Sequence, residues 1–152
     1  MRLGRRIGID YGAVRIGVAV STVDSIMCSP LTTVQNSETA LQELASLIDE
    51  QGAIEVYVGL PLNLSGDFTK STESAVELAK GLAQAIDVEV RLVDERMSTR
   101  AAQGQLQSSG KNSKQSRSLI DGAAASLILE GALAFEKATG KQPGRSVLEF
   151  DE

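Results

Sequence analysis

Residues 5–21, "RRIGIDYGAVRIGVAVS", decide the fold class because two short apolar stretches flank one turn. From position 16 to position 21, Ile, Val and Val alternate with Gly, Ala and Ser, a period of two that is typical of a β-strand. Gly12 and the two residues after it predict a tight turn. We therefore expect two consecutive strands that pair in antiparallel fashion.

The rest of the chain continues with one more strand and then with alternating helices and strands. We expect strands at 25–34 (bent or ended near Pro30), 54–61 and 88–95, and helices at 37–52 (Ser37 as N-cap, Gly52 as stop), 71–86, 98–107 and 118–138. Residues 108–116 are polar and are predicted to be flexible. This order predicts an α/β protein with a five-stranded mixed sheet, its first three strands antiparallel, flanked by helices.

The length of 152 residues fits one domain, which we place at residues 1–139. Residues 140–152 have the composition of a flexible C-terminal tail. No apolar run has the length of a membrane span, and the N-terminus lacks the features of a signal peptide, so the expected location is the cytoplasm.

Composition excludes several kinds of chemistry. The chain has no histidine, which removes Ser-His-Asp, Cys-His and Cys/His zinc sites. Its single cysteine, Cys28, cannot form an internal disulfide and is expected to be a small buried hydrophobic residue. Aromatic residues make up 3% of the chain, so base stacking is not expected to dominate nucleic-acid binding.

Charge is unevenly distributed in this acidic chain of formal net charge −5. Residues 91–117 hold six basic and two acidic residues, and a second basic group lies near the N-terminus: Arg2, Arg5, Arg6 and Arg15. A locally basic face suits a phosphate backbone, and a solvated surface is the alternative.

Three acids lie on three separate predicted elements. Asp10 lies in an apolar strand, where Ile7 and Ile9 are expected to face one way and Gly8 and Asp10 the other. Glu95 ends the strand at 88–95, and Asp121 lies near the start of the last helix. Singly, these acids have ordinary explanations: Asp10 as a turn former, Glu95 as a helix cap or a partner of Arg96, and Asp121 as a helix-dipole partner. Together, carboxylates from several elements are what a divalent-metal site requires.

Four segments in order resemble the YqgF-type pre-16S rRNA nucleases, a family also described as Holliday-junction-resolvase-like with an RNase H-like fold. These segments are "GIDYGAVRIGVAVS", "VGLPLNLSG", "LVDERMST" and "IDGAAASLILE". The resemblance implies that Asp10, Glu95 and Asp121 form a catalytic, metal-binding triad for Mg²⁺ or Mn²⁺. It also implies hydrolysis of a phosphodiester in the 5′-end processing of precursor 16S ribosomal RNA, a step of ribosome biogenesis in the cytoplasm.

The residues proposed to contact the nucleic-acid backbone are Arg15, Arg96, Lys111, Lys114 and Arg117. Asp94, which precedes Glu95, falls on the non-catalytic position of the motif and is expected to face the other side of the strand.

Other functions stay open at this point. A four-way DNA junction is an alternative substrate, and because junction resolvases act as dimers, a homodimer is also open. A nucleic-acid-binding factor without hydrolysis, acting in transcription or ribosome assembly, is a further alternative. An actin-type phosphotransferase fits Asp10-Tyr11-Gly12 superficially, but such enzymes need two domains.

Overall fold

The computed structural model describes residues 2–61, 67–94 and 113–148, and for residues 113–122 it describes only the course of the backbone. The elements within these ranges are β1 (Arg6–Asp10), β2 (Arg15–Ser21), β3 (Cys28–Gln35), α1 (Ala40–Gln51), β4 (Glu55–Leu60), α2 (Lys70–Ala85), β5 (Glu89–Asp94), α4 (Ser113–Thr139) and β6 (Arg145–Ser146). The predicted helix at 98–107 lies outside the described residues. No helix in the described ranges is both long and apolar enough to cross a membrane.

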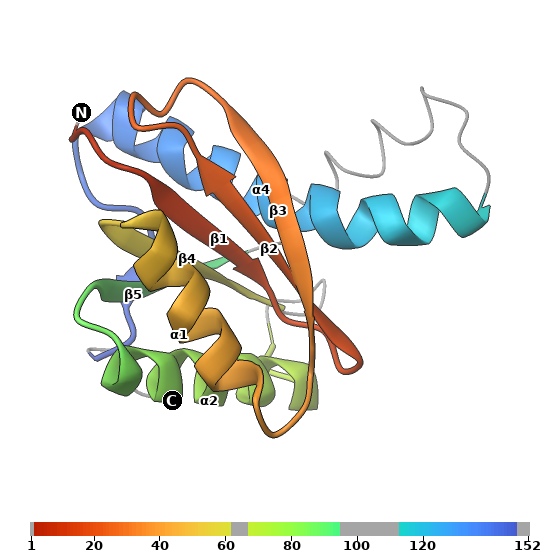
Figure 1. Cartoon of the computed structure of the whole chain (residues 1–152). Coiled ribbons are helices and arrows are strands. Elements are labelled where there is room, and N and C mark those ends of the chain that lie inside the picture. Colours follow the sequence, from red (N-terminus) through yellow and green to blue (C-terminus); the bar gives the residue numbers. More distant parts are fainter. Residues whose placement is uncertain (1, 62–66, 95–112, 149–152) are drawn as a thin grey trace.

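The strands form one mixed sheet in the order β3-β2-β1-β4-β5-β6 (Figure 1). β1 pairs antiparallel with β2, and β2 with β3, which confirms the predicted meander. β4 pairs parallel with β1, and β5 parallel with β4. The carboxyl ends of β1, β4 and β5 therefore lie at the same edge of the sheet, which we call the carboxyl edge.

The predicted count of five strands is wrong by one, because β6 pairs antiparallel with β5. This two-residue strand comes from the segment expected to be a flexible tail. The next residue, Val147, is buried in the core beside β5, and its amide donates to the carbonyl of Val90. Residues 145–147 are thus held against the sheet by strand pairing and by burial of an apolar side chain.

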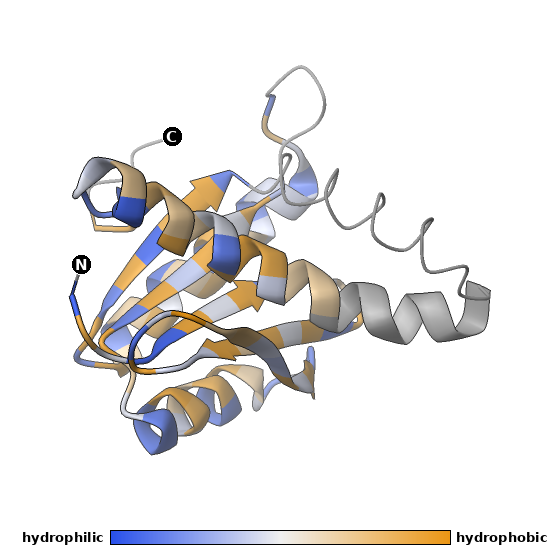
Figure 2. Cartoon of the chain, turned by 90° about the horizontal axis from the view of Figure 1, so that it is seen from above, coloured by the Kyte–Doolittle hydropathy of each residue, from blue (hydrophilic) through white to orange (hydrophobic). Residues whose placement is uncertain are grey.

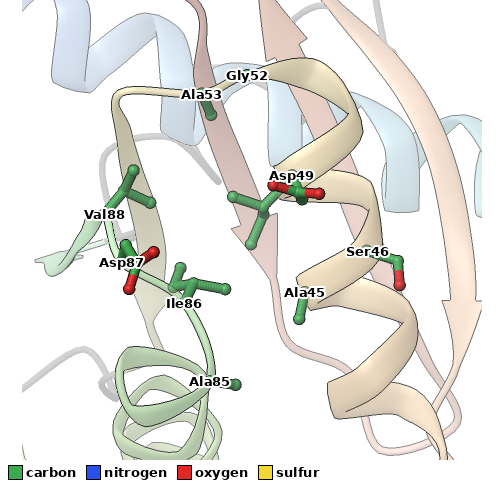
Figure 3. A pocket seen from close by; sticks show the side chains of 10 residues that line it. Ala45, Ser46, Asp49, Gly52, Ala53, Ala85, Ile86, Asp87 and Val88 are labelled. Atoms are coloured by element: carbon green, nitrogen blue, oxygen red, sulfur yellow. The ribbon is translucent and has the colours of Figure 1, made fainter.

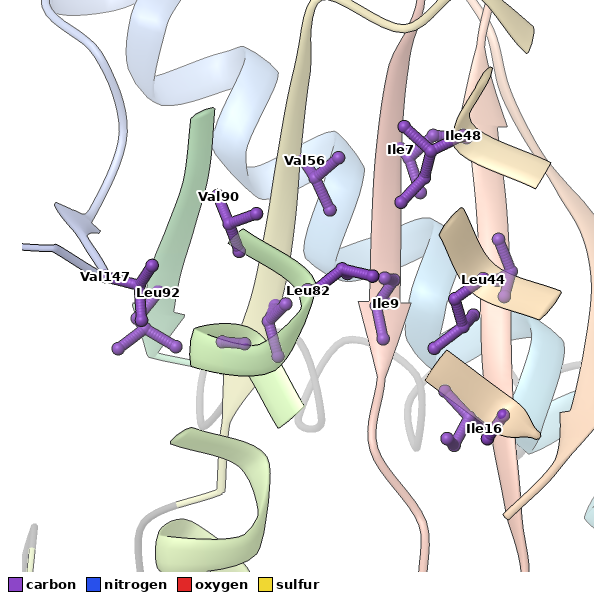
Figure 4. Close-up of a cluster of buried hydrophobic side chains, with 14 of the residues drawn as sticks. Ile7, Ile9, Ile16, Leu44, Ile48, Val56, Leu82, Val90, Leu92 and Val147 are labelled. Atoms are coloured by element: carbon purple, nitrogen blue, oxygen red, sulfur yellow. The ribbon is translucent and has the colours of Figure 1, made fainter. Parts of the chain in front are cut away.

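Each face of the sheet packs against helices. On one face, Ile7, Ile9 and Val56 pack with Leu44 of α1 and Leu82 of α2 (Figure 4). On the other face, α4 packs over Ala19 and Tyr57 through an apolar stripe. Figure 2 shows hydrophobic residues along the strands between these layers, interrupted by polar ones. Because both faces are covered, the inner strands are apolar on both sides.

Two helix starts differ from the prediction. The N-cap of α1 is Thr39, because Ser37 instead forms the preceding turn, in which its carbonyl accepts from the amide of Ala40. Gly52 ends α1 in the left-handed conformation, as expected. α4 begins at Ser113, so residues 113–116 are helical and not part of a flexible segment.

Candidate active site

Asp10 is the last residue of β1 and lies at the carboxyl edge. It pairs with Gly17 of β2, and the register of β1 with β4 places Gly59 on its other side. Residues in register on neighbouring strands point to the same face, so the half-buried Asp10 side chain has a residue without a side chain on each flank. The neighbouring strands therefore place no side chain beside the Asp10 carboxylate on this face.

The face on which Asp10 lies is the one covered by α4. Gly8, two residues earlier, contacts α4 so closely that an added Cβ would lie 2.8 Å from the carbonyl oxygen of Ala125. Ile7 and Ile9 belong to the core on the opposite face. The alternation predicted for β1 is confirmed.

The direction of α4 brings the backbone at Asp121 toward the carboxyl edge. Glu136 contacts Arg6 at the start of β1, whereas Ala125 lies beside Gly8 in its middle. α4 therefore runs antiparallel to β1, and residue 121 is one turn, about 6 Å, further toward the Asp10 end. The side chain of Asp121 lies outside what the structure describes.

The structure does not support the explanation that Asp121 interacts with the dipole at the start of its helix. α4 begins at Ser113, so residue 121 lies about two turns inside the helix. The electrostatic effect of a helix terminus is confined to roughly its first turn.

Glu95 follows directly after β5 and lies outside the described residues. β5 is separated from β1 only by β4, so its end is about 10 Å from that of β1. Leu92 packs into the core on the α1/α2 face, whereas Val93 packs against the cluster under α4. Continued alternation predicts that position 95 faces α4, as Asp10 does, and that the side chain of Asp94 faces the other way, although Asp94 also borders the hollow between α4 and the end of β5.

Of the five predicted backbone-binding residues, Arg15 is the one whose side chain the structure describes. It is the exposed first residue of β2, two positions before Gly17, and therefore on the same face of the sheet as Asp10. Lys114 and Arg117 lie in the first part of α4, where only the backbone is described. Arg96 and Lys111 lie outside the described residues.

Two hollows in the described part of the molecule have different relations to Asp10. The one in Figure 3, of about 360 Å³, lies between the end of α1 and residues 86–88, so it is at the amino ends of β4 and β5 and includes two acids, Asp49 and Asp87. A hollow of about 310 Å³ is lined by residues that include Val93, Asp94, Ile128 and Phe135, between α4 and the end of β5. The second of these borders the carboxyl edge at Asp94, and a further hollow of about 300 Å³, lined by residues that include Tyr11 and Ser37, borders it next to Asp10.

A buried polar network at the opposite edge of the sheet was not predicted. Nη2 of Arg6 lies 3.1 Å from Oε2 of Glu136, and Nη2 of Arg2 lies 2.9 Å from Oε1 of Glu55. The hydroxyl of Tyr57 donates to Oε1 of Glu55 at 2.7 Å. One sequence signal was available, since Glu136 continues the buried stripe of Leu129, Ala132 and Leu133 at helical spacing, and a buried acid needs a partner.

The network changes the pKa values of its members. Burial alone would raise the pKa of Glu55, but hydrogen bonds from Arg2 and Tyr57 and the charge of Arg2 outweigh burial and lower it. The pKa of Glu136 is likewise lowered, because Arg2 and Arg6 outweigh the effect of burial. Burial and the neighbouring Glu55 raise the pKa of Tyr57, so this hydroxyl stays protonated and donates.

A divalent metal ion is compatible with the donors at the carboxyl edge. Asp10 offers carboxylate oxygens beside an open flank, and the chain has no histidine, so any site here would consist of oxygen ligands, which Mg²⁺ and Mn²⁺ prefer. No group of three or more potential metal ligands is found among the described residues. The two further predicted ligands, Glu95 and Asp121, have side chains outside that part.

These features define an α/β protein of the RNase H-like class, with a mixed sheet, an acid at the end of its first strand and a long helix across that face. The fold is similar to that of Thermus thermophilus RuvC in complex with a Holliday junction substrate, with a TM-score of 0.56 and 16% identity over 94% of this chain and 99% of that one. It is also similar to the fowlpox virus resolvase, with a TM-score of 0.50 and 8% identity over 90% of this chain and 99% of that one.

The chain belongs to the RuvX family, whose model, described as Holliday junction resolvase, matches residues 4–134. A protein from Leifsonia xyli, named "Putative pre-16S rRNA nuclease", is 47% identical over 97% of this chain and 96% of its own length. One of the same name from Streptomyces coelicolor is 45% identical over 97% and 90%. The family resemblance noted in the sequence is therefore confirmed.

Proposed function

We propose that this protein is a metal-dependent endonuclease that hydrolyses a phosphodiester of precursor 16S ribosomal RNA near its 5′ end. The observation that carries the proposal is the position of Asp10 at the carboxyl edge, on the α4 face and between two glycines. The names of the relatives support a nuclease acting on this RNA. The family description and the RuvC-like fold support nucleic acid as the substrate class.

In this proposal Asp10, Glu95 and Asp121 are the metal ligands and the catalytic residues. Bound Mg²⁺ or Mn²⁺ would supply an activated water molecule and stabilise negative charge on the leaving oxygen. Carboxylates on a strand, at a strand end and on a helix hold their oxygens on rigid supports, which favours a defined geometry. Arg15, on the same face as Asp10, would contact a phosphate of the substrate.

A four-way DNA junction is the second candidate substrate. It is favoured by the family description and by the likeness to a resolvase that was solved with its junction. Symmetrical cleavage of a junction needs two active sites, so this candidate requires a homodimer, whereas cleavage of a single RNA strand does not.

The test incubates the full chain with 5′-labelled precursor ribosomal RNA and, in parallel, with a labelled four-way DNA junction. Each substrate is combined with Mg²⁺, Mn²⁺ or EDTA. The protein variants are Asp10→Asn, Glu95→Gln and Asp121→Asn, with Asp94→Asn as the matched control, since Asp94 is the acid next to Glu95 that is predicted to face away.

Metal-dependent cleavage of RNA that is lost in the three triad variants and kept in Asp94→Asn is the expected result. Cleavage of the junction but not of RNA, by a dimeric protein, would show that the DNA junction is the substrate. Cleavage that survives all three triad substitutions would refute the site. RNA binding without cleavage of either substrate would indicate a non-catalytic binding factor.

A further inference from the structure

One buried ion pair connects α4 with β1 at the edge of the sheet opposite Asp10. Arg6, the first residue of β1, has an exposed fraction of 0%, and Glu136, near the end of α4, has one of 4%. Their Nη2 and Oε2 atoms are 3.1 Å apart. Placing two charges in the interior is costly, and further hydrogen bonds to the two groups offset part of that cost, although the buried Nε of Arg6 has no hydrogen-bond partner among the described residues.

The surrounding residues hold this pair in one geometry. Nη1 of Arg6 donates to the hydroxyl of Tyr57 at 3.3 Å, and its Nη2 also donates to the carbonyl oxygen of Arg2 at 2.7 Å. Arg2 in turn donates to Oε1 of Glu136 at 2.5 Å and to Oε1 of Glu55 at 2.9 Å. The planar guanidinium groups make these contacts directional, so a shift of α4 along β1 would break both bonds to Glu136, from Arg6 and from Arg2, at once.

The apolar part of the α4 contact does not resist such a shift in the same way. Gly8 and Ala19 on the sheet contact a stripe of α4 in which alanines stand beside larger residues: Ala125, Ile128, Leu129, Ala132 and Leu133. Burial of these apolar side chains is favourable but non-directional, whereas the bonds to Glu136 need a defined geometry. A slide of α4 along β1 by the rise of one residue, about 1.5 Å, would keep its apolar stripe on the sheet.

The same two elements also position two of the three proposed catalytic acids. Arg6 and Asp10 are at the two ends of β1 and on the same face. Glu136 and Asp121 are both on α4, fifteen positions apart, close to four whole turns. Because β1 and α4 are both rigid, a displacement of α4 relative to β1 at Arg6 would also displace Asp121 relative to Asp10.

We propose that Arg6 and Glu136 are positioning residues: they set the register of α4 on β1 and thereby hold Asp121 beside Asp10. The metal-binding part of this inference rests on the proposed function, whereas the register part does not. The two parts are tested by separate measurements.

The single cysteine of the chain reports the register directly. Cys28, at the start of β3, is half-buried against the cluster under α4. Burial and the nearby Glu130 raise the pKa of its thiol to about 11, so it reacts slowly with thiol reagents while α4 covers it. Displacement of α4 exposes the thiol and speeds its reaction.

The experiment compares four full-length proteins: wild type, the double variant Arg6→Met/Glu136→Leu, Glu136→Gln, and Arg5→Met as the matched control. In the double variant, apolar side chains replace both charges, and Arg2, Glu55 and Tyr57 still satisfy one another. Glu136→Gln keeps the side-chain volume and provides the comparison if the double variant does not fold. Arg5 is the exposed neighbour of Arg6, and its side chain donates to Gln51 of α1 on the other face.

Three quantities are measured: the melting temperature in EDTA, the rate of Cys28 modification under native conditions, and the dissociation constant for Mn²⁺ from the electron paramagnetic resonance signal of free Mn²⁺. We expect a folded double variant in which Cys28 reacts several-fold faster and Mn²⁺ binds about 10- to 100-fold more weakly. We expect Arg5→Met to match wild type in both the Cys28 rate and Mn²⁺ affinity.

A folded double variant with the wild-type Cys28 rate would overturn the register function, whatever its Mn²⁺ affinity. A faster Cys28 with unchanged Mn²⁺ affinity would overturn the link to the acids. If wild type itself binds no Mn²⁺, the proposed metal site fails, and the Cys28 rate still decides the register.

Discussion

Gly8 of β1 and Ala125 of α4 are in backbone contact, with no space for a side chain between them. A Cβ at position 8 would lie 2.8 Å from the carbonyl oxygen of Ala125 and 2.9 Å from Cβ of Leu129. The absence of a side chain at position 8 thus lets α4 lie directly on β1. It also brings the helix close to the strand that ends at Asp10.

Gly8→Ala is therefore expected to push α4 away from the sheet. Overpacking of this kind destabilises a protein by about 1–3 kcal/mol, measured here as the free energy of unfolding in urea. The control is Gly81→Ala in α2, where the new Cβ would lie 3.4 Å from Cδ2 of Leu41, an ordinary contact, and where alanine favours the helix by up to about 1 kcal/mol. Equal unfolding free energies for the two variants would contradict the close contact at Gly8.

The buried network predicts that stability falls in acid. The pKa values of Glu55 and Glu136 are lower in the folded chain than their ordinary value of 4.5, so the unfolded chain binds protons more readily in acid. This contribution is fully present above pH 4.5 and is lost as the pH falls below it. Melting temperatures from pH 7 to pH 3 measure the effect.

Glu55→Gln is expected to reduce this pH dependence and to lower stability at pH 7 by about 1–3 kcal/mol, because it removes the charge that faces Arg2. Glu50→Gln, an exposed acid on α1, is the control and is expected to follow the wild-type profile. A Glu55→Gln profile parallel to that of wild type would show that Glu55 makes no such contribution.

Local sequence patterns predicted most of the strands, because the alternation of residues along each strand matches the face on which each side chain lies. The alternation at positions 16–21 appears as β2, and Gly8 and Asp10 lie on one face as the period of two requires. β6 could not be predicted in this way. Two residues have no periodicity, and they form a strand only because the edge of β5 is available to them.

The site could be predicted only in part, for a similar reason. The sequence indicated the three acids and the strand and helix on which Asp10 and Asp121 lie. It did not indicate the pairing of Arg6 with Glu136, which are 130 positions apart and meet only after α4 has crossed the sheet. Nor did it indicate that Gly17 and Gly59 flank Asp10, since that depends on the register of three strands.

Metal binding is expected to stabilise the folded chain through Asp10. At a Mn²⁺ concentration about 100 times the dissociation constant, the gain is about 2.7 kcal/mol, seen as a higher melting temperature. Asp10→Asn is expected to lose this gain, because it removes one carboxylate ligand of the proposed metal site. Asp94→Asn, the control at the end of β5, is expected to keep the gain. A Mn²⁺-dependent increase in Asp10→Asn as large as that of wild type would exclude Asp10 as a ligand.

Arg15 is expected to bind a phosphate, since it is exposed on the same face as Asp10 at the carboxyl edge. In an Asp10→Asn background, which prevents cleavage, Arg15→Ala is expected to raise the Kd for a single-stranded precursor RNA fragment about two- to fivefold. Because one phosphate contact is lost, the slope of log K against log salt concentration falls in magnitude by about 0.7. Fluorescence anisotropy at a series of salt concentrations measures both the Kd and the salt slope.

The control for Arg15→Ala is Arg5→Ala, which removes an exposed arginine at the other end of β1, where its side chain donates to Gln51. It is expected to change neither the Kd nor the salt slope. A lower affinity with an unchanged salt slope would mean that Arg15 acts on the fold of the turn and not on a phosphate.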